Sequence, residues 1–285
     1  MTTREIAVGK DLTVVQNILL DAMDQIHNLC EETGIVYYLI GGSALGAVRH
    51  KGFIPWDVDI DIAMHREDYD RFAEIAEKRL PPGLSFHDYK NTPKYYSPHA
   101  TVCVDDVCAI IDPNYYREAK LGNLLVDIFP LDNAPDDEEL REKQARELKR
   151  LVRIHSRKEC VLYKRNTLIQ VLIKKMIRIA LLPYSLERLE ARRDAILTRY
   201  DADDTKCWCS MVSHYPYTRQ CMDKEIYGVP VKMEFAGRMY YVPHKTEAYL
   251  TRIFGEHYME LPPVEKRVRP GDLIEKIIIT ERKIK

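Results

Sequence analysis

The sequence predicts an α/β (α+β) fold in which helices flank a mixed β-sheet and a further layer of helices is attached to it. Three observations support this prediction. Two runs, 36–40 and 57–62, read as strands, and a glycine turn and a short helix lie between them. A third run, 124–129, is apolar except for one acid, as in a central strand. From residue 136 to about 200 the pattern is almost entirely helical.

Local signals set the bounds of the flanking elements. Thr13 and Gln16 form a capping box, and an apolar stripe at helical spacing continues up to Gly34. Residues 66–80 have the pattern of a helix that Pro81 ends. We also expect short strands at 84–89, 99–104 and 107–112, a hairpin at 235–242 and a helix at 247–254.

The change to a helical pattern divides the chain into three parts. We expect a core at 1–135, a helical insertion at 136–200 and a carboxy-terminal part at 201–285 that packs back on the core. The three parts are expected to form one compact unit. The insertion would supply a second wall that encloses a substrate.

The segment 161–182 within this insertion is open to two interpretations. Its lysines and arginines accompany a broad apolar surface, so it resembles a helix that lies on an anionic membrane. It also fits a core helix of the insertion whose charged tips reach water. The width of the apolar face favours the core interpretation.

Composition excludes some functional classes. The 285-residue chain is 46% hydrophobic, which is enough for a full core, and its 43 Lys and Arg residues balance 44 Asp and Glu residues. No net positive field would attract nucleic acid. Seven cysteines, an odd number, fit reduced thiols. There is no signal-peptide pattern and no apolar run long enough to span a bilayer. We therefore expect a cytoplasmic protein, which could also bind peripherally to the inner face of the membrane.

A glycine turn follows the first predicted strand. Gly41 and Gly42 allow backbone conformations with positive φ, and Ser43 is a good N-cap for a short helix. Backbone amides at a helix N-terminus bind anions. Gly41, Gly42 and Ser43 are therefore candidate substrate-binding residues, with phosphate as the expected group.

Three acids alternate along the next predicted strand. Asp57, Asp59 and Asp61 project from one face if the strand is regular, and neighbouring acids could bend toward one Mg²⁺. Alternatively, the segment is an exposed edge strand, and its acids discourage aggregation with other strands. Because the glycine turn precedes the acids, we favour a metal site with Asp59 and Asp61 as ligands and Asp57 in support.

Asp127 is the single acid in the apolar run 124–129. A lone carboxylate is costly to bury without a partner, so metal ligation or general-base chemistry explains it better than a structural role.

Several further residues near the turn are candidate substrate contacts. Arg49, His50 and Lys51 follow the short helix, where cations could contact phosphates, although solvated loop charges are equally consistent. Trp56 precedes the acids and could face a quaternary ammonium group or simply pack in the core.

The longer string around these residues resembles a known family. A Gly-Gly-Ser turn followed by Asp-x-Asp resembles the nucleotidyltransferase superfold, and residues 46–64 look like the signature of the LicD family, which includes fukutin-type proteins. The segments 68–72, 126–132 and 235–263 agree with that family. One departure is Val58, where the family usually carries an acid; its side chain is expected to face away from the metal.

The resemblance implies a nucleotidyltransferase-like core and a Mg²⁺-dependent transferase, with Mn²⁺ as an alternative ion. Such enzymes move a phosphorylated small alcohol, phosphocholine or ribitol phosphate, from a cytidine diphosphate (CDP) donor to a sugar hydroxyl. The expected acceptor is a cell-surface glycan, such as lipopolysaccharide or teichoic acid, or its lipid-linked precursor. The superfold usually completes its metal site with a third carboxylate from a neighbouring strand, and Asp127 fits that position.

Two alternatives to this function remain open. The same metal site could transfer the nucleoside monophosphate itself to a small molecule or sugar. The chain could also be a non-catalytic glycan-binding protein with a relic site, although it retains every expected acid.

Overall fold

Strand β6 (Leu121–Ala134) runs through the middle of the sheet. It pairs antiparallel with β5 (Ala100–Ile111) on one edge and parallel with β3 (Ile60–His65) on the other. Alternate side chains along its central part are fully buried. Asp127 therefore lies on a central strand, as the sequence predicts.

The computed structural model describes residues 2–7, 12–93, 95, 97–111, 121–159, 166–182, 185–267 and 274–281. The α-helices are α1 (Thr13–Thr33), α2 (Gly41–His50), α3 (Arg66–Arg79), α4 (Glu138–Glu159), α5 (Leu168–Ala180), α6 (Leu186–Leu197), α7 (Tyr217–Gln220), α8 (Lys224–Tyr227) and α9 (Thr246–Phe254). The other strands are β1 (Thr2–Ala7), β2 (Tyr38–Leu39), β4 (Leu84–His87), β7 (Cys207–Cys209), β8 (Cys221–Asp223), β9 (Val231–Phe235), β10 (Arg238–Val242) and β11 (Ile274–Glu281).

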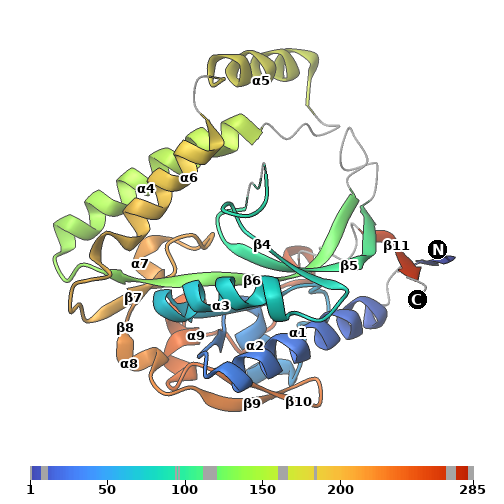
Figure 1. Cartoon of the computed structure of the whole chain (residues 1–285). Coiled ribbons are helices and arrows are strands. Elements are labelled where there is room, and N and C mark those ends of the chain that lie inside the picture. The colour runs from blue at the N-terminus through green and yellow to red at the C-terminus, as the bar shows by residue number, and fades with distance from the viewer. Residues whose placement is uncertain are drawn as a thin grey trace.

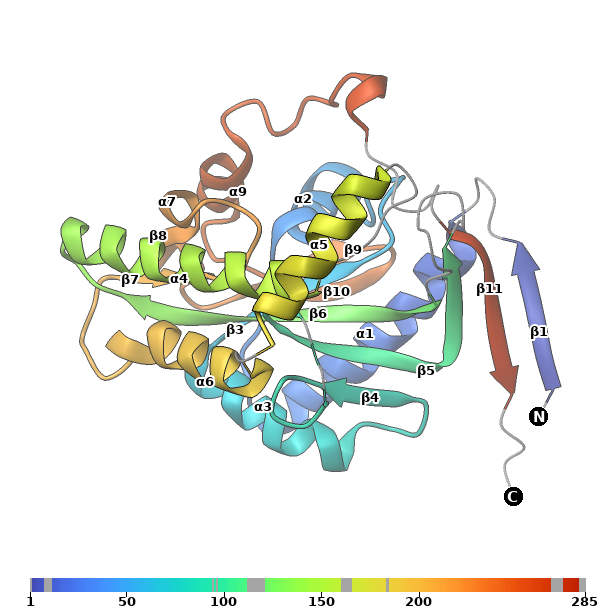
Figure 2. The same ribbon diagram turned by 90° about the horizontal axis from the view of Figure 1, so that it is seen from above.

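The main sheet has the strand order β1-β11-β5-β6-β3-β2 among the described residues. Strand β4 pairs with β5, and β7 joins the end of β6 to β8. The pair β3 and β6 is parallel, and the other described pairings are antiparallel, so the sheet is mixed. Strands β1 and β11 bring the two ends of the chain to the same edge (Figure 2).

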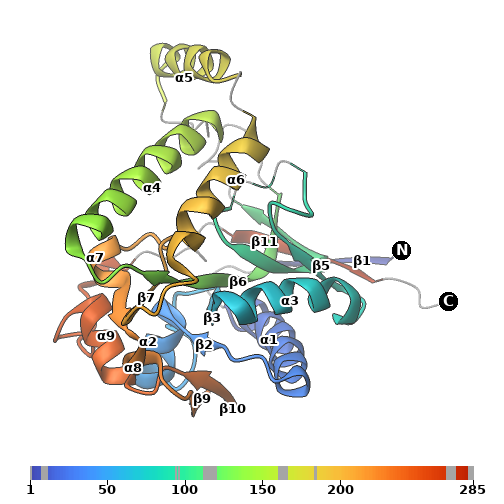
Figure 3. The same ribbon diagram turned by 60° about the vertical axis from the view of Figure 1, so that its left-hand side comes forward.

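Helices lie on both sides of this sheet. Helices α1, α2 and α9 and the β9–β10 hairpin gather on one side, whereas α4 and α6 rise from the other (Figure 1). Figure 3 shows α4 and α6 side by side, with α5 beyond their far ends. The α/β fold with an added helical layer is thus confirmed.

One large core cluster joins the sheet to the first set of helices. Helix α1 contributes the buried side chains Val15, Leu19 and Met23, which repeat at the spacing of one helical face. The helix ends where the sequence predicts, because Gly34 adopts the left-handed conformation that terminates it. The helix at 66–80, the hairpin at 235–242 and the helix at 247–254 are also confirmed.

Two local predictions need correction, and two strands were not predicted. The strand expected at 57–62 starts only at Ile60, because a backbone hydrogen bond from Asp57 N–H to the Ile54 carbonyl turns the chain before it. The strands expected at 99–104 and 107–112 form one strand, β5, with a register shift between them. The terminal strands β1 and β11 were not expected.

Helix α5 contradicts the core interpretation of the segment 161–182. The structure describes this segment from residue 166 onward, and none of the residues of α5 is buried. Among the described helices, none is long and apolar enough to cross a membrane.

The close approach of helix α2 to the loop after it depends on a glycine. A Cβ atom on Gly46 would lie 2.3 Å from the carbonyl oxygen of Gly52, closer than atoms can pack. This contact fixes how the chain leaves α2 and enters the segment that carries the acids.

We predict that Gly46→Ala lowers the free energy of unfolding by about 2 kcal/mol, because the methyl group forces the backbone apart. Alanine otherwise stabilises a helix relative to glycine by ~1 kcal/mol, so a loss of stability would come from the contact with Gly52. Chemical denaturation measures it. Gly52→Ala, whose Cβ would lie 3.3 Å from its nearest neighbour, is the milder control. Unchanged stability of Gly46→Ala contradicts the prediction.

Candidate active site

The start of helix α2 lies directly against two acids. Gly41 has a positive φ of 52°. A Cβ atom there would lie 3.2 Å from Asp61 Oδ2, and one on Gly42 would lie 3.0 Å from Asp57 Oδ2. The two glycines thus let carboxylates approach the helix N-terminus, where the helix dipole favours negative charge.

Ser43 has a different role from the one predicted. The residue that caps α2 is Ile40, so Ser43 lies inside the first turn. Its hydroxyl accepts a hydrogen bond of 2.9 Å from the backbone N–H of Asp61. The N–H of Gly41 donates to the Tyr249 hydroxyl at 2.9 Å. Both contacts tie the turn to neighbouring elements, and the second uses the Gly41 N–H, which is then not open to a phosphate.

The acids come together from a loop and two neighbouring strands. Asp57 and Asp59 lie in the loop before β3, and Asp61 lies on β3 itself. The parallel pairing of β3 with β6 places Asp61 opposite Asp127 in register. The predicted grouping of Asp61 with Asp127 across two strands is present, although the regular alternation of all three acids is not.

Burial and the neighbouring acids disfavour the charged forms of Asp59 and Asp61, and burial disfavours that of Asp57. Burial raises the pKa of Asp59 to about 9, and the nearby Asp61 and Asp57 add to the effect. Burial also raises the pKa of Asp61 well above its usual range, and Asp127 is the strongest neighbouring charge. Asp57 and Asp59 share a side-chain hydrogen bond, which requires a proton on one of them.

No Lys or Arg in the described part of the chain forms an ion pair with Asp57, Asp59 or Asp61. Such uncompensated carboxylates have the oxygen donors that a hard divalent cation prefers, so the residues fit Mg²⁺. The described residues do not, however, include three His, Cys, Asp or Glu side chains arranged to hold one ion. The match between these residues and Mg²⁺ therefore rests on their negative charge and oxygen donors, and not on a preformed coordination geometry.

Asp127 has a histidine partner that the sequence did not reveal. His99 Nε2 lies 3.0 Å from Asp127 Oδ1, and the imidazole stacks on Phe129 with ring centroids 4.2 Å apart. His99 reaches Asp127 because it directly precedes β5, which pairs with β6. Only the strand pairing brings them together, so sequence spacing gave no signal of it.

The acids open into a cavity of about 440 Å³ between the sheet and the helical layer. Asp59, Asp61 and Asp127 line one end of it. The rest of the lining is mainly apolar, and much of it comes from α4 and α6: Phe129, Leu148, Leu151, Val152, Leu189, Met211 and Val212. A small molecule with one polar and one less polar part would fit such a space.

The wall opposite the acids carries a second polar group of residues. His155 on α4 approaches Glu190 on α6, with Nε2 and Oε1 2.6 Å apart, and Arg193 pairs with the same carboxylate. Glu190 and Arg193 are buried yet line the cavity. None of the three could be predicted from the sequence, because each looks like an ordinary charge on a predicted helix.

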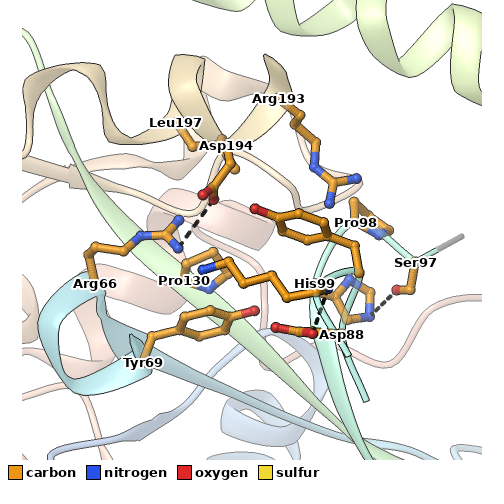
Figure 4. A pocket seen from close by; sticks show the side chains of 12 residues that line it. Arg66, Tyr69, Asp88, Ser97, Pro98, His99, Pro130, Arg193, Asp194 and Leu197 are labelled. Atoms are coloured by element: carbon orange, nitrogen blue, oxygen red, sulfur yellow. Dashed lines mark hydrogen bonds and ion pairs between the residues drawn. The ribbon is translucent and has the colours of Figure 1, made fainter. Parts of the chain in front are cut away.

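A small, water-sized pocket adjoins this wall (Figure 4). There the Arg66 side chain extends toward Asp194 of α6, with 3.6 Å between Nη1 and Oδ1. Arg66 also pairs with the buried Asp132 at 2.6 Å. Burial raises the pKa of Asp132 to about 6, while Arg66 opposes the shift. This network connects α3, the end of β6 and α6, and so holds the helical layer over the sheet.

The lining of the cavity does not include four of the predicted substrate contacts: Arg49, His50, Lys51 and Trp56. Arg49 donates to the backbone carbonyls of Tyr258 and Glu260, at 2.9 and 3.2 Å, and to His50 Nε2 at 3.0 Å. Lys51 is exposed and caps the end of α2 in the left-handed conformation. The guanidinium of Arg267 lies 5.2 Å from the ring centroid of Trp56. These residues organise the loops around α2 in the structure.

The arrangement matches a described family. Residues 34–132, which contain the turn and all four acids, match the family model of the LicD/FKTN/FKRP nucleotidyltransferase domain. This segment is similar to the LicD family. The lipopolysaccharide cholinephosphotransferase LicD of Haemophilus influenzae is 27% identical to the chain, over 93% of the chain and 97% of that protein. The ribitol 5-phosphate transferase FKRP of Homo sapiens is 53% identical over 45 residues, which are 16% of the chain and 9% of FKRP.

The segment that matches the family model stops before the helical layer, whereas the similarity to the Haemophilus protein continues through it. The cavity therefore combines acids from the family domain with a wall from α4 and α6.

We predict that Asp61→Asn stabilises the protein in the presence of a chelator. Because the pKa of Asp61 is raised on folding, wild-type stability falls as pH increases above the carboxyl's unfolded value. The amide removes this penalty, so at pH 8 the melting temperature should rise by about 2–4 °C, and the gain should shrink toward acid pH.

Thermal unfolding monitored by circular dichroism at several pH values measures this effect. The matched control is Asp204→Asn, which changes an exposed acid and should leave the melting temperature unchanged. A melting temperature that is lower for Asp61→Asn than for the wild type at pH 8 contradicts the prediction.

Proposed function

We propose that this protein is a transferase that moves a phosphorylated small alcohol, phosphocholine or a similar group, from a CDP-linked donor to a sugar hydroxyl of a glycan. The observation that carries the proposal is the similarity to a cholinephosphotransferase over nearly the full length of both chains. The short match to a ribitol 5-phosphate transferase supports the same class of reaction with another alcohol.

The reaction breaks one phosphoanhydride bond and forms one phosphodiester. The sugar hydroxyl oxygen attacks the phosphorus that carries the alcohol, the bond from this phosphorus to the bridging oxygen breaks, and cytidine monophosphate (CMP) leaves with that oxygen. The hydroxyl loses its proton. Such transfers depend mainly on positioning and on neutralising charge.

The acid end of the cavity suits the diphosphate only with a cation present, because carboxylates repel phosphate. Asp59, Asp61 and Asp127 would hold Mg²⁺, with Asp57 in support. When bound, Mg²⁺ would neutralise charge on the diphosphate and on the departing CMP. Mn²⁺ prefers similar oxygen ligands and would serve in its place.

Asp127 is the proposed proton acceptor for the sugar hydroxyl. It lies at the cavity, and its Oδ1 is 3.0 Å from His99 Nε2. A general base must reach the proton that it takes, and a hydroxyl in the cavity would satisfy this requirement.

The helical wall is the proposed acceptor side. Glu190, Arg193 and His155 present carboxylate, guanidinium and imidazole groups at the cavity, opposite the acids. Together these groups can accept hydrogen bonds from some sugar hydroxyls and donate hydrogen bonds to others. The apolar side chains between the two ends would keep water away from the reacting phosphorus.

Incubation with Mg²⁺, a glycan acceptor and a panel of CDP-linked donors labelled in the alcohol tests the proposal. Release of CMP together with label on the glycan supports it. Transfer of the labelled nucleotide to the acceptor supports nucleotidyl transfer instead. If every donor gives neither turnover nor metal-dependent binding, the site is a relic.

We predict that Asp59→Asn lowers the turnover of the best donor by at least about a hundredfold, because it removes a carboxylate that neutralises charge through the cation. Circular dichroism should show an unchanged fold. The exposed Asp204→Asn variant should keep full activity. Turnover of Asp59→Asn close to that of the wild type would reject its role in the site.

A further inference from the structure

Helix α5 turns its apolar side away from the protein. Its large apolar side chains are between 50 and 80% exposed: Leu168, Ile169, Leu172, Ile173, Met176 and Ile179. At 3.6 residues per turn these side chains gather on one half of the helix. A helix that packs on a protein core would bury this half.

The side that faces the rest of the protein is the less apolar one. The half-buried residues of α5 are Val171, Lys174 and Ile177, which follow one another at a spacing of three along one edge. Lys174 Nζ donates to Asn166 Oδ1 at 3.1 Å. This edge of α5 therefore faces the protein, and its more apolar half is left outward.

The helix is well defined at its start. The Thr167 hydroxyl accepts from the Gln170 N–H at 3.2 Å, and the Gln170 side chain accepts from the Thr167 N–H at 3.0 Å. This reciprocal pair is a capping box, which stabilises a helix without tertiary packing. Figures 1 and 3 show α5 apart from the sheet, beyond the ends of α4 and α6.

The charged residues of α5 itself have one sign. Residues 166–182 contain Lys174, Lys175 and Arg178 and no Asp or Glu. The end of α4 adds the exposed Arg157 and also Lys158, whose Nζ donates to the Leu181 carbonyl at 3.1 Å. An exposed apolar face bordered by cations complements a surface that is negatively charged outside and apolar within.

We propose that α5 is an interfacial helix that docks on an anionic lipid bilayer. The side chains Leu168, Leu172, Met176 and Ile179 enter the boundary between headgroups and acyl chains, and Lys175 and Arg178 contact lipid phosphates. A second copy of this chain fits less well, because pairing through the same face would bring the cations of two copies together. The proposal does not depend on the reaction catalysed.

Docking would also orient the cavity. Helices α4 and α6 carry α5 at their far ends and form one wall of the cavity. A protein held by α5 would present this wall, and the opening between it and the sheet, at a constant height above the membrane surface.

Sedimentation of the full-length protein with vesicles tests the proposal. The probes are phosphatidylcholine vesicles and vesicles that also contain phosphatidylglycerol. We expect the wild type to bind the anionic vesicles, to bind phosphatidylcholine alone at least about tenfold more weakly, and to be released as salt is raised.

Two variants of α5 separate the apolar and electrostatic contributions. Leu172→Asp with Met176→Asp should abolish binding, and Lys175→Gln with Arg178→Gln should weaken it on the order of tenfold. The matched control is Val229→Asp with Met259→Asp, which places the same charges at exposed apolar residues far from α5 in sequence and should bind as the wild type does. All substituted side chains are exposed, so unfolding is not expected.

Absence of wild-type binding to both kinds of vesicle overturns the proposal, as does wild-type-like binding by Leu172→Asp with Met176→Asp. Sedimentation velocity supplies a further readout. A wild type that self-associates without binding vesicles, and becomes monomeric in the α5 variants, would identify a second copy as the occupant and also overturn the proposal.

Discussion

The burial of carboxylates between strands β3 and β6 constrains the rest of the structure. Asp61 and Asp127 are in register on parallel neighbours, and burial together with repulsion from Asp127 disfavours the charged form of Asp61. The fold accommodates this cost locally. Glycines at the start of α2 let the acids approach a helix N-terminus, and Ser43 fixes the backbone of Asp61. A site with this much unneutralised charge reduces stability, which is expected where function requires it.

Much of the fold could be predicted from the sequence, because its signals are local. The apolar stripe of α1 and the glycine that ends it identify a helix, and the run around Asp127 identifies a central strand. The start of β3 could not be predicted. Acidic and apolar residues alternate regularly from residue 57 onward, but the chain turns at Asp57 and the strand begins only afterwards. The exposure of α5 was also missed. A wide apolar face normally indicates a buried helix, and only the three-dimensional position of α5 reveals that its face points outward.

The candidate site was predictable to the same degree. The acids and the glycine turn adjoin one another in sequence, so their pattern was visible. His99, Glu190 and Arg193 reach the cavity only through strand pairing and through the position of α6, and single residues of these types carry no local signal. Conversely, Arg49 adjoins the turn in sequence but directs its side chain to loop carbonyls. Proximity in sequence identified the charged end of the cavity and not its opposite wall.

The central claim is that Asp59, Asp61 and Asp127 together bind one divalent cation. Anomalous X-ray diffraction from crystals soaked in Mn²⁺ and a cytidine diphosphate tests it most directly. We expect a manganese peak at coordination distance from Asp61 and at least one of the other two carboxylates, and no such peak in crystals of Asp61→Asn. A saturated wild-type crystal with manganese elsewhere, or with none at these acids, would contradict it.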